Sequence, residues 1–212
     1  MPTKTRKNKK TDRQIICQDA IKWLATQTNL DCIVTSVPEM DEVKLKEAAY
    51  ETFFRKAVEL SLNATKDTGY TIFLQTDRKY KGWIDKSYLI SDVAHELGHR
   101  MIWHKIALRQ NVGTSGLFRP TFSHMLCYSK KGKVGPVFPD VIERGTVTYE
   151  NAFGIDAVKA VLEYVKKQGA KTVVDPFVGS GTTVALANQI GLKGIGVDID
   201  PKQCKKAMGL IL

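Results

Sequence analysis

The sequence predicts an α/β protein with a doubly wound, mostly parallel sheet of about seven strands. Two observations support this prediction. Short β-branched apolar runs alternate with stretches in which apolar residues recur every three or four positions. Near the carboxyl end, Val173-Val174-Asp175 leads through closely spaced glycines into another helical stretch, the pattern of a strand, a loop and a helix. The chain has 212 residues, 43% of them hydrophobic, which is enough for one full core, so we expect one domain.

The expected elements alternate along the chain. Apolar β-branched runs predict strands at 13–18, 31–35, 71–75, 100–106 and 124–129, and two more that end at Asp175 and Asp198. Helical spacing of apolar residues predicts helices at 19–28, 43–64, 86–97 and 155–168. A last helix begins after Asp200-Pro201, because aspartate caps helices and proline suits the first turn. Only a loop joins the strands at 100–106 and 124–129, so we expect an antiparallel pair at the sheet edge.

The chain is basic, with 32 Lys and Arg against 22 Asp and Glu and a formal net charge of +10. Lysines and arginines are concentrated at 1–13, where we expect a disordered arm. The folded domain is then expected at 14–212. Because basic tails raise the affinity for polyanions, nucleic acid, either RNA or DNA, is the favoured partner.

The sequence favours an intracellular protein, cytoplasmic or nuclear. No apolar run is long enough to cross a bilayer, and the first residues lack the apolar core of a signal peptide. The cysteines, Cys17, Cys32, Cys127 and Cys204, form no Cys-x-x-Cys pair. Because Cys17 and Cys32 lie in strand-like runs, we expect buried thiols in a reducing compartment.

The segment from Val173 to Thr183 predicts a site for a nucleoside cofactor. Its glycines allow the backbone to contact a ligand, and about twenty residues later a second strand ends in Asp198, where an acid can hold both ribose hydroxyls. Gly181 is followed by threonines instead of the lysine that a P-loop needs, so ATP or GTP hydrolysis is not expected. The dinucleotide fingerprint is also incomplete, since Val184 stands where its third glycine would be.

The run Asp175-Pro176-Phe177-Val178-Gly179-Ser180-Gly181-Thr182-Thr183 resembles the first motif of the S-adenosylmethionine-dependent amino-methyltransferases, which modify cytosine N4 or adenine N6. The resemblance implies a Rossmann-like methyltransferase fold with S-adenosyl-L-methionine as the cofactor. It also implies the circularly permuted order of the family's β class, because the cofactor motif lies late in the chain. The catalytic half would be 14–150 and the cofactor half 151–212.

The same resemblance assigns roles to residues. It places the amino-acid end of the cofactor at Asp175, Pro176, Phe177, Gly179, Ser180, Gly181, Thr182 and Thr183, the ribose at Asp198 and the adenine at Asp19, with Thr35 as a further cofactor residue. Phe153 and Gly154 precede the helix at 155–168, where related enzymes have a loop around the methionine end. Cofactor contact and an ordinary helix entry are equally open for these two residues.

The acceptor motif departs from the family pattern. Family members carry Asp, Asn or Ser, then Pro-Pro and an aromatic residue that stacks on the flipped base, whereas this chain has Ser36-Val37-Pro38-Glu39. Ser36 and the Val37 carbonyl can still accept hydrogen bonds from a target amine, but Glu39 cannot stack. Stacking could come from Trp83, Phe118 or Phe122. Alternatively, Glu39 accepts a proton or hydrogen bond from a different nucleophile, or it faces solvent in an inactive protein.

A competing motif is His95-Glu96-Leu97-Gly98-His99, which satisfies the H-E-x-x-H pattern of zinc hydrolases. A third ligand at the expected spacing is missing, and Gly98 is expected to end the helix before His99. We therefore expect no metal site, and zinc hydrolysis through His95, Glu96 and His99 is a remote alternative.

The sequence thus favours a methyltransferase that acts on nucleic acid, with an exocyclic base nitrogen as the leading acceptor. RNA is slightly favoured over DNA, because the short segment at 130–149 has no room for a large recognition domain. The alternative is a noncatalytic S-adenosylmethionine-binding subunit of an RNA or ribonucleoprotein complex. A homodimer or a partner subunit is possible, and no membrane partner is expected.

Overall fold

The computed structural model describes residues 12–79, 82–135, 138–149 and 152–212. Nearly all of the predicted basic arm lies outside the described residues. The first described strand begins at Arg13, the last residue of that arm. The guanidinium of Arg13 donates to the carbonyl oxygens of Ala207 and Leu210, at 2.7 and 2.9 Å, and so joins the first strand to the carboxyl-terminal helix.

The described residues form one eight-stranded sheet in the order β1-β8-β7-β2-β3-β5-β4-β6. Its strands are β1 (Arg13–Cys17), β2 (Leu30–Thr35), β3 (Thr65–Gln75), β4 (Arg100–Leu108), β5 (Phe122–Ser129), β6 (Val141–Glu143), β7 (Thr172–Asp175) and β8 (Lys193–Asp198). Within this sheet only β5 runs against the others, since it is antiparallel to both β3 and β4 while every other pairing is parallel. The predicted α/β fold with a mostly parallel sheet is confirmed.

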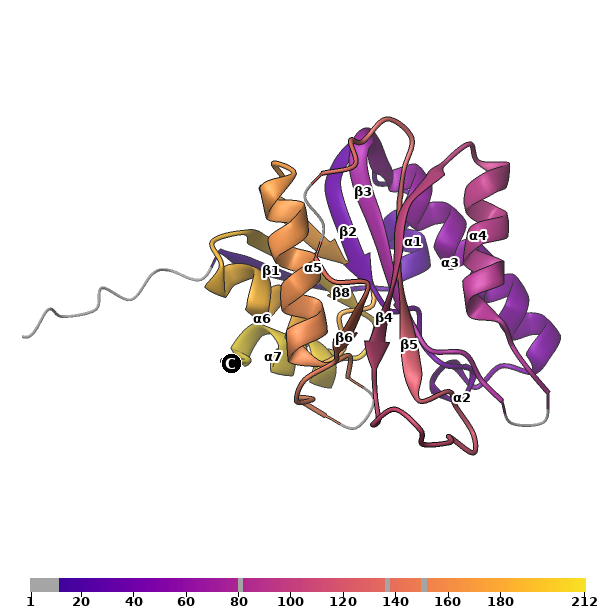
Figure 1. Cartoon of the computed structure of the whole chain (residues 1–212). Helices are drawn as coiled ribbons and strands as arrows, with labels where there is room; N and C mark the ends of the chain where they lie inside the picture. Colours follow the sequence, from indigo (N-terminus) through magenta and orange to yellow (C-terminus); the bar gives the residue numbers. More distant parts are fainter. Residues whose placement is uncertain (1–11, 80–81, 136–137, 150–151) are drawn as a thin grey trace, which may run out of the picture.

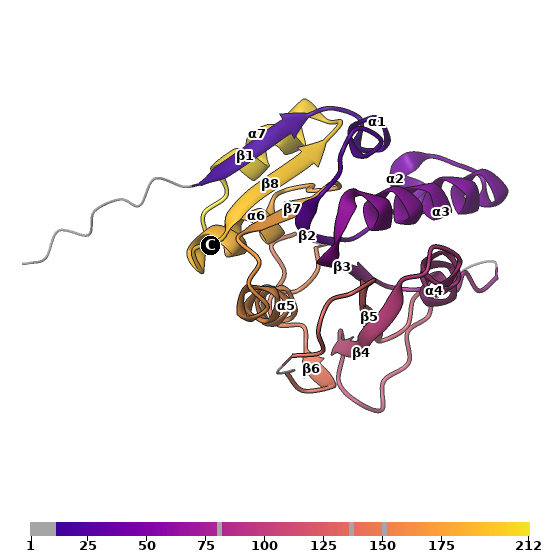
Figure 2. The ribbon, with the colours of Figure 1, turned by 90° about the horizontal axis from the view of Figure 1, so that it is seen from above.

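Helices cover both faces of the sheet (Figure 1 and Figure 2). They are α1 (Ala20–Leu24), α2 (Met40–Val43), α3 (Glu47–Ala64), α4 (Lys86–Glu96), α5 (Ile155–Lys167), α6 (Thr182–Gln189) and α7 (Pro201–Gly209). In Figure 2, α5, α6 and α7 lie on one face, and α1, α3 and α4 lie on the other. Each face buries its own apolar cluster: α5 and α6 pack over strands β2 to β5 and β7 on one side, and α3 and α4 pack over β3 and β5 on the other.

Several predicted boundaries are corrected by the structure. The predicted helix at 43–64 begins only at Glu47, as α3, because Lys44 adopts a left-handed conformation with φ of 54° and ends the separate short helix α2 at Val43. One strand, β6, was not predicted. It is only three residues long and partly exposed, so its sequence has no apolar run that would indicate a strand. As a result, the antiparallel pair of β4 and β5 is confirmed, but β6 forms the edge of the sheet beyond it. Helix α1 ends at Leu24 instead of residue 28.

The thiols differ from the prediction. All four cysteines are free, and Cys32 and Cys127 are buried, but Cys17 is exposed at the end of the edge strand β1 and Cys204 is half-buried. Edge position explains the difference for Cys17, since β1 has a neighbouring strand on one side only. Among the described residues, no helix combines the length and the apolar character that a bilayer span requires.

The parallel strands bring their carboxyl ends to one edge of the sheet. The connections that follow two of these strands, β7 and β2, leave toward opposite faces. From β7 the chain crosses through α6 to β8 on one face, while from β2 it crosses through α3 to β3 on the other (Figure 2). Because β7 and β2 are neighbours, the loops that follow them separate and leave a crevice between them. Ligands of doubly wound sheets bind in such crevices.

Candidate functional site

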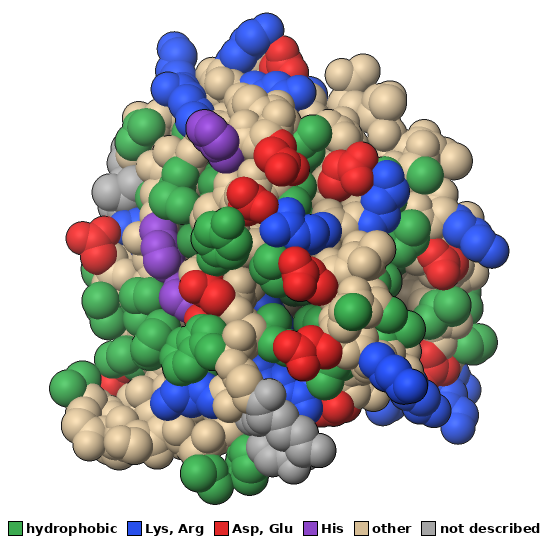
Figure 3. Space-filling view, turned by 90° about the vertical axis from the view of Figure 1, so that its right-hand side faces the viewer, with side chains coloured by type: hydrophobic (Ala, Val, Ile, Leu, Met, Phe, Trp, Pro, Cys, Tyr) green, Lys and Arg blue, Asp and Glu red, His purple; other side chains and the backbone are tan. Residues whose placement is uncertain are grey.

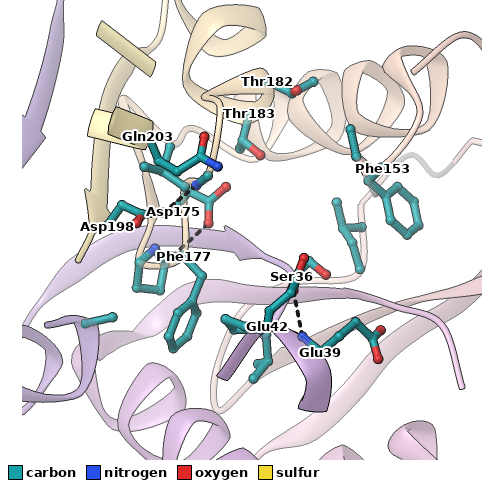
Figure 4. A pocket seen from close by; sticks show the side chains of 18 of the residues that line it. Ser36, Glu39, Glu42, Phe153, Asp175, Phe177, Thr182, Thr183, Asp198 and Gln203 are labelled. Atoms are coloured by element: carbon teal, nitrogen blue, oxygen red, sulfur yellow. Dashed lines mark hydrogen bonds between the residues drawn. The ribbon is translucent and has the colours of Figure 1, made fainter. Parts of the chain in front are cut away.

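A cavity of about 590 Å³ lies at this crevice. Figure 4 shows side chains of the loop after β7 on one side and side chains of the loop after β2 on the other. Asp175, Thr183 and Asp198 lie on the first side, and Ser36 and Glu39 on the second. The two segments that the sequence assigned to the cofactor and to the acceptor therefore share one cavity.

The loop between β7 and α6 takes its shape from two glycines. Gly179 and Gly181 have φ angles of 50° and 95°, which L side chains rarely adopt. At Gly181 a Cβ atom would also lie 2.6 Å from the Cα of Ala207 in α7. This glycine therefore lets the loop turn directly against α7 and begin α6 at Thr182.

Asp175 holds the start of this loop. Its carboxylate accepts a hydrogen bond from the Thr35 hydroxyl at 2.7 Å and from the Phe177 amide at 3.2 Å. Burial raises the pKa of Asp175 to about 6, against the hydrogen bonds from Thr35 and Thr183, which lower it. Thr35 is itself buried and does not line the cavity. Its hydroxyl instead ties the end of β2 to the end of β7.

Asp198 lies at the carboxyl end of β8 and faces the cavity (Figure 4). One carboxylate oxygen accepts from the Gly179 amide at 3.0 Å and the other from the Asp200 amide at 2.8 Å. These two bonds fix the carboxylate while each oxygen keeps a lone pair for a ligand. Next to it, Gln203 of α7 lines the cavity and accepts from the Ser180 hydroxyl at 3.3 Å. Sequence reasoning missed Gln203 because it lies beyond the recognised motifs.

The other predicted cofactor residues fall into two groups. Asp19, Phe153, Pro176, Phe177, Gly179, Thr182 and Thr183 line the cavity, whereas Gly154, Ser180 and Gly181 do not. Asp19 caps α1 by accepting from the Lys22 amide at 3.0 Å. A Cβ atom at Gly154 would lie 2.0 Å from the carbonyl oxygen of Arg144. Gly154 therefore allows the backbone at Arg144 to come close. The sequence had suggested that the group approaching this glycine could be the cofactor.

The acceptor loop is held by Gln75, at the carboxyl end of β3. The Ser36 hydroxyl donates to the Gln75 side-chain oxygen at 2.8 Å, and the Gln75 amide donates to the Val37 carbonyl at 2.8 Å. The Tyr50 hydroxyl donates to the Pro38 carbonyl at 3.1 Å. Ser36 is exposed to the cavity, and its oxygen keeps lone pairs because it acts as the donor toward Gln75.

Glu39 forms a largely buried ion pair, so it does not face solvent. Its carboxylate lies 2.6 Å from the ammonium of Lys86 and 3.8 Å from the guanidinium of Arg119. The Lys86 side chain is 0% exposed and that of Glu39 is 13% exposed. Burial lowers the pKa of Lys86, and the neighbouring carboxylate of Glu39 opposes this shift.

Aromatic side chains line the cavity, but not those suggested by the sequence. Trp83 and Phe118 are exposed, and neither they nor Phe122 line the cavity. The aromatic residues that do line it are Phe53, Tyr149, Phe153 and Phe177. Phe53 and Phe177 meet edge to face, with ring centroids 6.3 Å apart. Burial raises the pKa of the Tyr149 hydroxyl to about 12.

The two histidines of the H-E-x-x-H motif lie in different environments. His95 is exposed near the end of α4, while His99 is buried just before β4. Neither ring nitrogen of His99 has a hydrogen-bond partner among the described residues. Within the described part of the chain, no three His, Cys, Asp or Glu side chains come together in a way that could hold a metal ion. The zinc-hydrolase alternative is therefore not supported.

One known protein family matches the later part of the chain. The family described as DNA methylase matches residues 143–209, which contain the loop after β7 and Asp198. This part of the chain is therefore similar to the DNA methylase family. The resemblance to the amino-methyltransferases, predicted from the residues between Asp175 and Thr183, is thereby confirmed.

Known proteins with related sequence or structure agree with this match. The type II methyltransferase M.BsoBI of Geobacillus stearothermophilus is 36% identical over 55 residues, which are 26% of this chain and 11% of that protein. PvuII DNA methyltransferase (cytosine-N4-specific) has a similar structure with a TM-score of 0.75 at 13% identity, covering 95% of this chain and 88% of its own. TTHA0409 of Thermus thermophilus, solved with S-adenosyl-L-methionine, gives a TM-score of 0.69 at 16% identity, covering 92% and 91%. These structural matches show that the chain shares the fold of these two proteins.

The residues present fit S-adenosyl-L-methionine. Asp198 offers carboxylate oxygens at the place where a ribose would lie, and the turn at Gly179 brings backbone close to the cavity. Phe177 and Ile21 give apolar surface, and Asp19 places a carboxylate beside them. The cavity volume of about 590 Å³ lies in the range of small-molecule sites.

Proposed function

We propose that this protein is an S-adenosylmethionine-dependent DNA methyltransferase that methylates an exocyclic amino group of a base. One observation carries the proposal: the loop after β7, in the part of the chain that the DNA methylase family matches, and the loop Ser36 to Glu39 line the same cavity. The bond from Thr35 to Asp175 joins the strands from which these loops leave, so the two loops have a fixed relation.

The residues of the cavity divide into two roles. Asp198, Asp19 and the backbone near Gly179 would hold S-adenosylmethionine, which supplies an electrophilic methyl group when bound. Ser36 and the Val37 carbonyl would accept hydrogen bonds from the target amine and orient its nitrogen toward that group. Gln75 keeps both acceptors in place through its bonds of 2.8 Å.

DNA replaces RNA as the proposed polymer. M.BsoBI is named as a type II methyltransferase, and the PvuII enzyme is named as a DNA methyltransferase specific for cytosine N4. The preference for RNA, which came from the shortness of the chain, is not supported by these names. The noncatalytic subunit has no support from them either. The basic arm, a homodimer or partner subunit, and an intracellular location stay predictions.

The test is transfer of a tritiated methyl group from S-adenosylmethionine to unmodified genomic DNA, total RNA and protein in parallel. We expect label in DNA, and nucleoside mass spectrometry then identifies the methylated base. Calorimetry measures cofactor binding separately. Binding of S-adenosylmethionine without methyl transfer to DNA, RNA or protein would refute the proposed methyltransferase activity. Label in RNA alone would refute DNA as the substrate.

A variant of Asp198 links the activity to the described site. Asp198→Asn should weaken S-adenosylmethionine binding about tenfold, because the ribose loses a charged hydrogen-bond acceptor. Glu163→Gln is the matched control, since Glu163 is exposed on α5 and does not line the cavity. Equal affinities of the two variants would show that Asp198 does not hold the cofactor.

A further inference from the structure

Three arginines line one end of the cavity. Arg109 directly follows β4, Arg119 precedes β5, and Arg144 directly follows β6. All three are half-buried. The predicted cofactor residues lie in the loop after β7 and at the end of β8. The arginines therefore belong to the other part of the sheet, on the side of the loop Ser36 to Glu39.

The charges of these arginines are close to one another and only partly balanced. Burial lowers the pKa of Arg109, the nearby guanidinium groups of Arg144 and Arg119 lower it further, and Glu39 opposes them. Glu39 already lies against the buried ammonium of Lys86. Glu42 also lines the cavity, where its carboxylate accepts from the Glu39 amide at 2.8 Å. Among the described residues that line the cavity on this side, the three guanidinium groups of Arg109, Arg119 and Arg144 therefore face the carboxylates of Glu39 and Glu42, and Glu39 is shared with Lys86.

Backbone contacts fix the places from which these side chains start. The Arg109 amide donates to the Thr121 carbonyl at 2.7 Å, and the Arg144 amide donates to the Leu108 carbonyl at 3.0 Å. The Arg144 carbonyl in turn accepts from the Asp156 amide at 3.1 Å, at the first turn of α5. Gly154 makes this close approach possible, because a side chain there would collide with the Arg144 carbonyl. The backbone positions from which the Arg109 and Arg144 side chains extend are thus fixed.

The cluster differs from an ordinary solvated basic surface. Figure 3 shows the face that carries α3 and α4, where acidic and basic side chains are interspersed. Exposed charges in such a mixed surface neutralise one another across water. Three guanidinium groups on one side of a cavity, with Glu39 and Glu42 as the carboxylates beside them, attract an anion, and their planar donor forks match phosphate oxygens.

We propose that Arg109, Arg119 and Arg144 bind the phosphate group attached to the acceptor nucleotide. This proposal rests on the proposed function and adds the subsite that holds the substrate beside its target base. The phosphate could be a diester within DNA or the monoester of a free nucleotide, and both present oxygens to the same donors. Glu39 limits the positive charge and orients Arg119, from which its carboxylate is 3.8 Å away.

The test measures binding of a fluorescein-labelled single-stranded deoxyoligonucleotide by anisotropy over a series of KCl concentrations. Arg144→Ala should weaken binding about tenfold and reduce the slope of log affinity against log salt by about 0.7, the value for one lost phosphate contact on a single strand. Arg109→Lys keeps the charge but loses the planar fork, so it should weaken binding with little change of slope. Lys56→Ala is the matched control, because Lys56 is half-exposed on α3, pairs with Glu59 and does not line the cavity.

Competition separates the two sources of phosphate. Displacement by an unlabelled oligonucleotide but not by a mononucleotide supports the diester, and displacement by a mononucleotide but not by its nucleoside supports the monoester. An unchanged slope and affinity in Arg144→Ala, with wild-type circular dichroism and cofactor binding, would overturn the subsite. If oligonucleotide binding depends on the arginines but no methyl group is transferred, the phosphate subsite is supported and the proposed function is refuted. If methyl transfer occurs and binding does not depend on the arginines, the proposed function is supported and the subsite is refuted.

Discussion

The ion pair of Glu39 and Lys86 permits a quantitative prediction of stability. Lys86 is 0% exposed, and its ammonium lies 2.6 Å from the Glu39 carboxylate. Glu39→Ala removes the hydrogen-bonded partner of this buried charge and leaves the more distant Asp77 carboxylate to act on it; breaking a buried pair in this way typically costs about 3–5 kcal/mol in the free energy of unfolding. For a chain of this size, that loss corresponds to a fall of roughly 6–20 °C in melting temperature.

The cost should disappear when the buried charge is also removed. We expect the double variant Glu39→Ala with Lys86→Met to recover most of the lost stability, because methionine fills similar volume without a charge. Urea unfolding followed by circular dichroism measures both variants, and the double-mutant cycle gives the coupling energy. The exposed pair of Lys56 and Glu59 is the control, and its removal should leave stability near the wild-type value.

The pH dependence of Glu39→Ala gives a second check on the same reasoning. Burial lowers the pKa of Lys86 and Glu39 raises it, so loss of Glu39 lowers the pKa further. The unfolded chain then binds the lysine proton more tightly than the folded chain, and the stability of the variant should rise with pH toward about 10.4. A loss below about 1 kcal/mol in Glu39→Ala, or a double variant no more stable than the single one, would refute the buried-charge argument.

The remaining predictions concern the loop after β7 and the arginines that line the cavity. Asp175 has its pKa raised to about 6, so its contribution to stability should fall by about 3 kcal/mol in total as pH rises from below 4 to above 6, and Asp175→Asn should flatten this part of the stability profile in urea titrations. Gly181→Ala should lower the melting temperature and weaken cofactor binding, because its φ is 95° and its Cβ would collide with Ala207; unchanged values would exclude the collision. Gly154→Ala should weaken oligonucleotide binding more than cofactor binding, since it displaces Arg144; equal losses would contradict that assignment.

The cofactor side of the site was predictable because its signals are local. Asp175, Gly181 and the start of α6 lie in one short segment, where a strand, a positive-φ turn and a helix follow each other. Asp198 was also recognisable, since an acid that ends the next strand reaches the same edge of a parallel sheet. These inferences needed no knowledge of contacts between distant parts of the chain.

The acceptor side was less predictable because its parts come from separate segments. Gln75 ends β3, Arg109 follows β4 and Arg144 follows β6, so they reach the same edge of the sheet only when these strands take their places, and no short motif contains them. Gly154 did indicate, from the sequence, that another group lies close to the backbone at this position. The approaching group is the Arg144 carbonyl, 2.0 Å from the position of an added Cβ, and sequence pattern alone could not distinguish it from a ligand.

The change from an aromatic residue to Glu39 and the presence of the arginines form one consistent arrangement. An aromatic residue holds a base through its π-face, with a stacking energy of about 1–3 kcal/mol. Glu39 cannot do this, and its carboxylate is occupied by Lys86 and lies near Arg119. Binding of the acceptor would then depend more on charged contacts outside the base, and Arg109, Arg119 and Arg144 supply such contacts in the same cavity. Substrate binding by this chain should therefore be more sensitive to salt than binding through an aromatic acceptor loop.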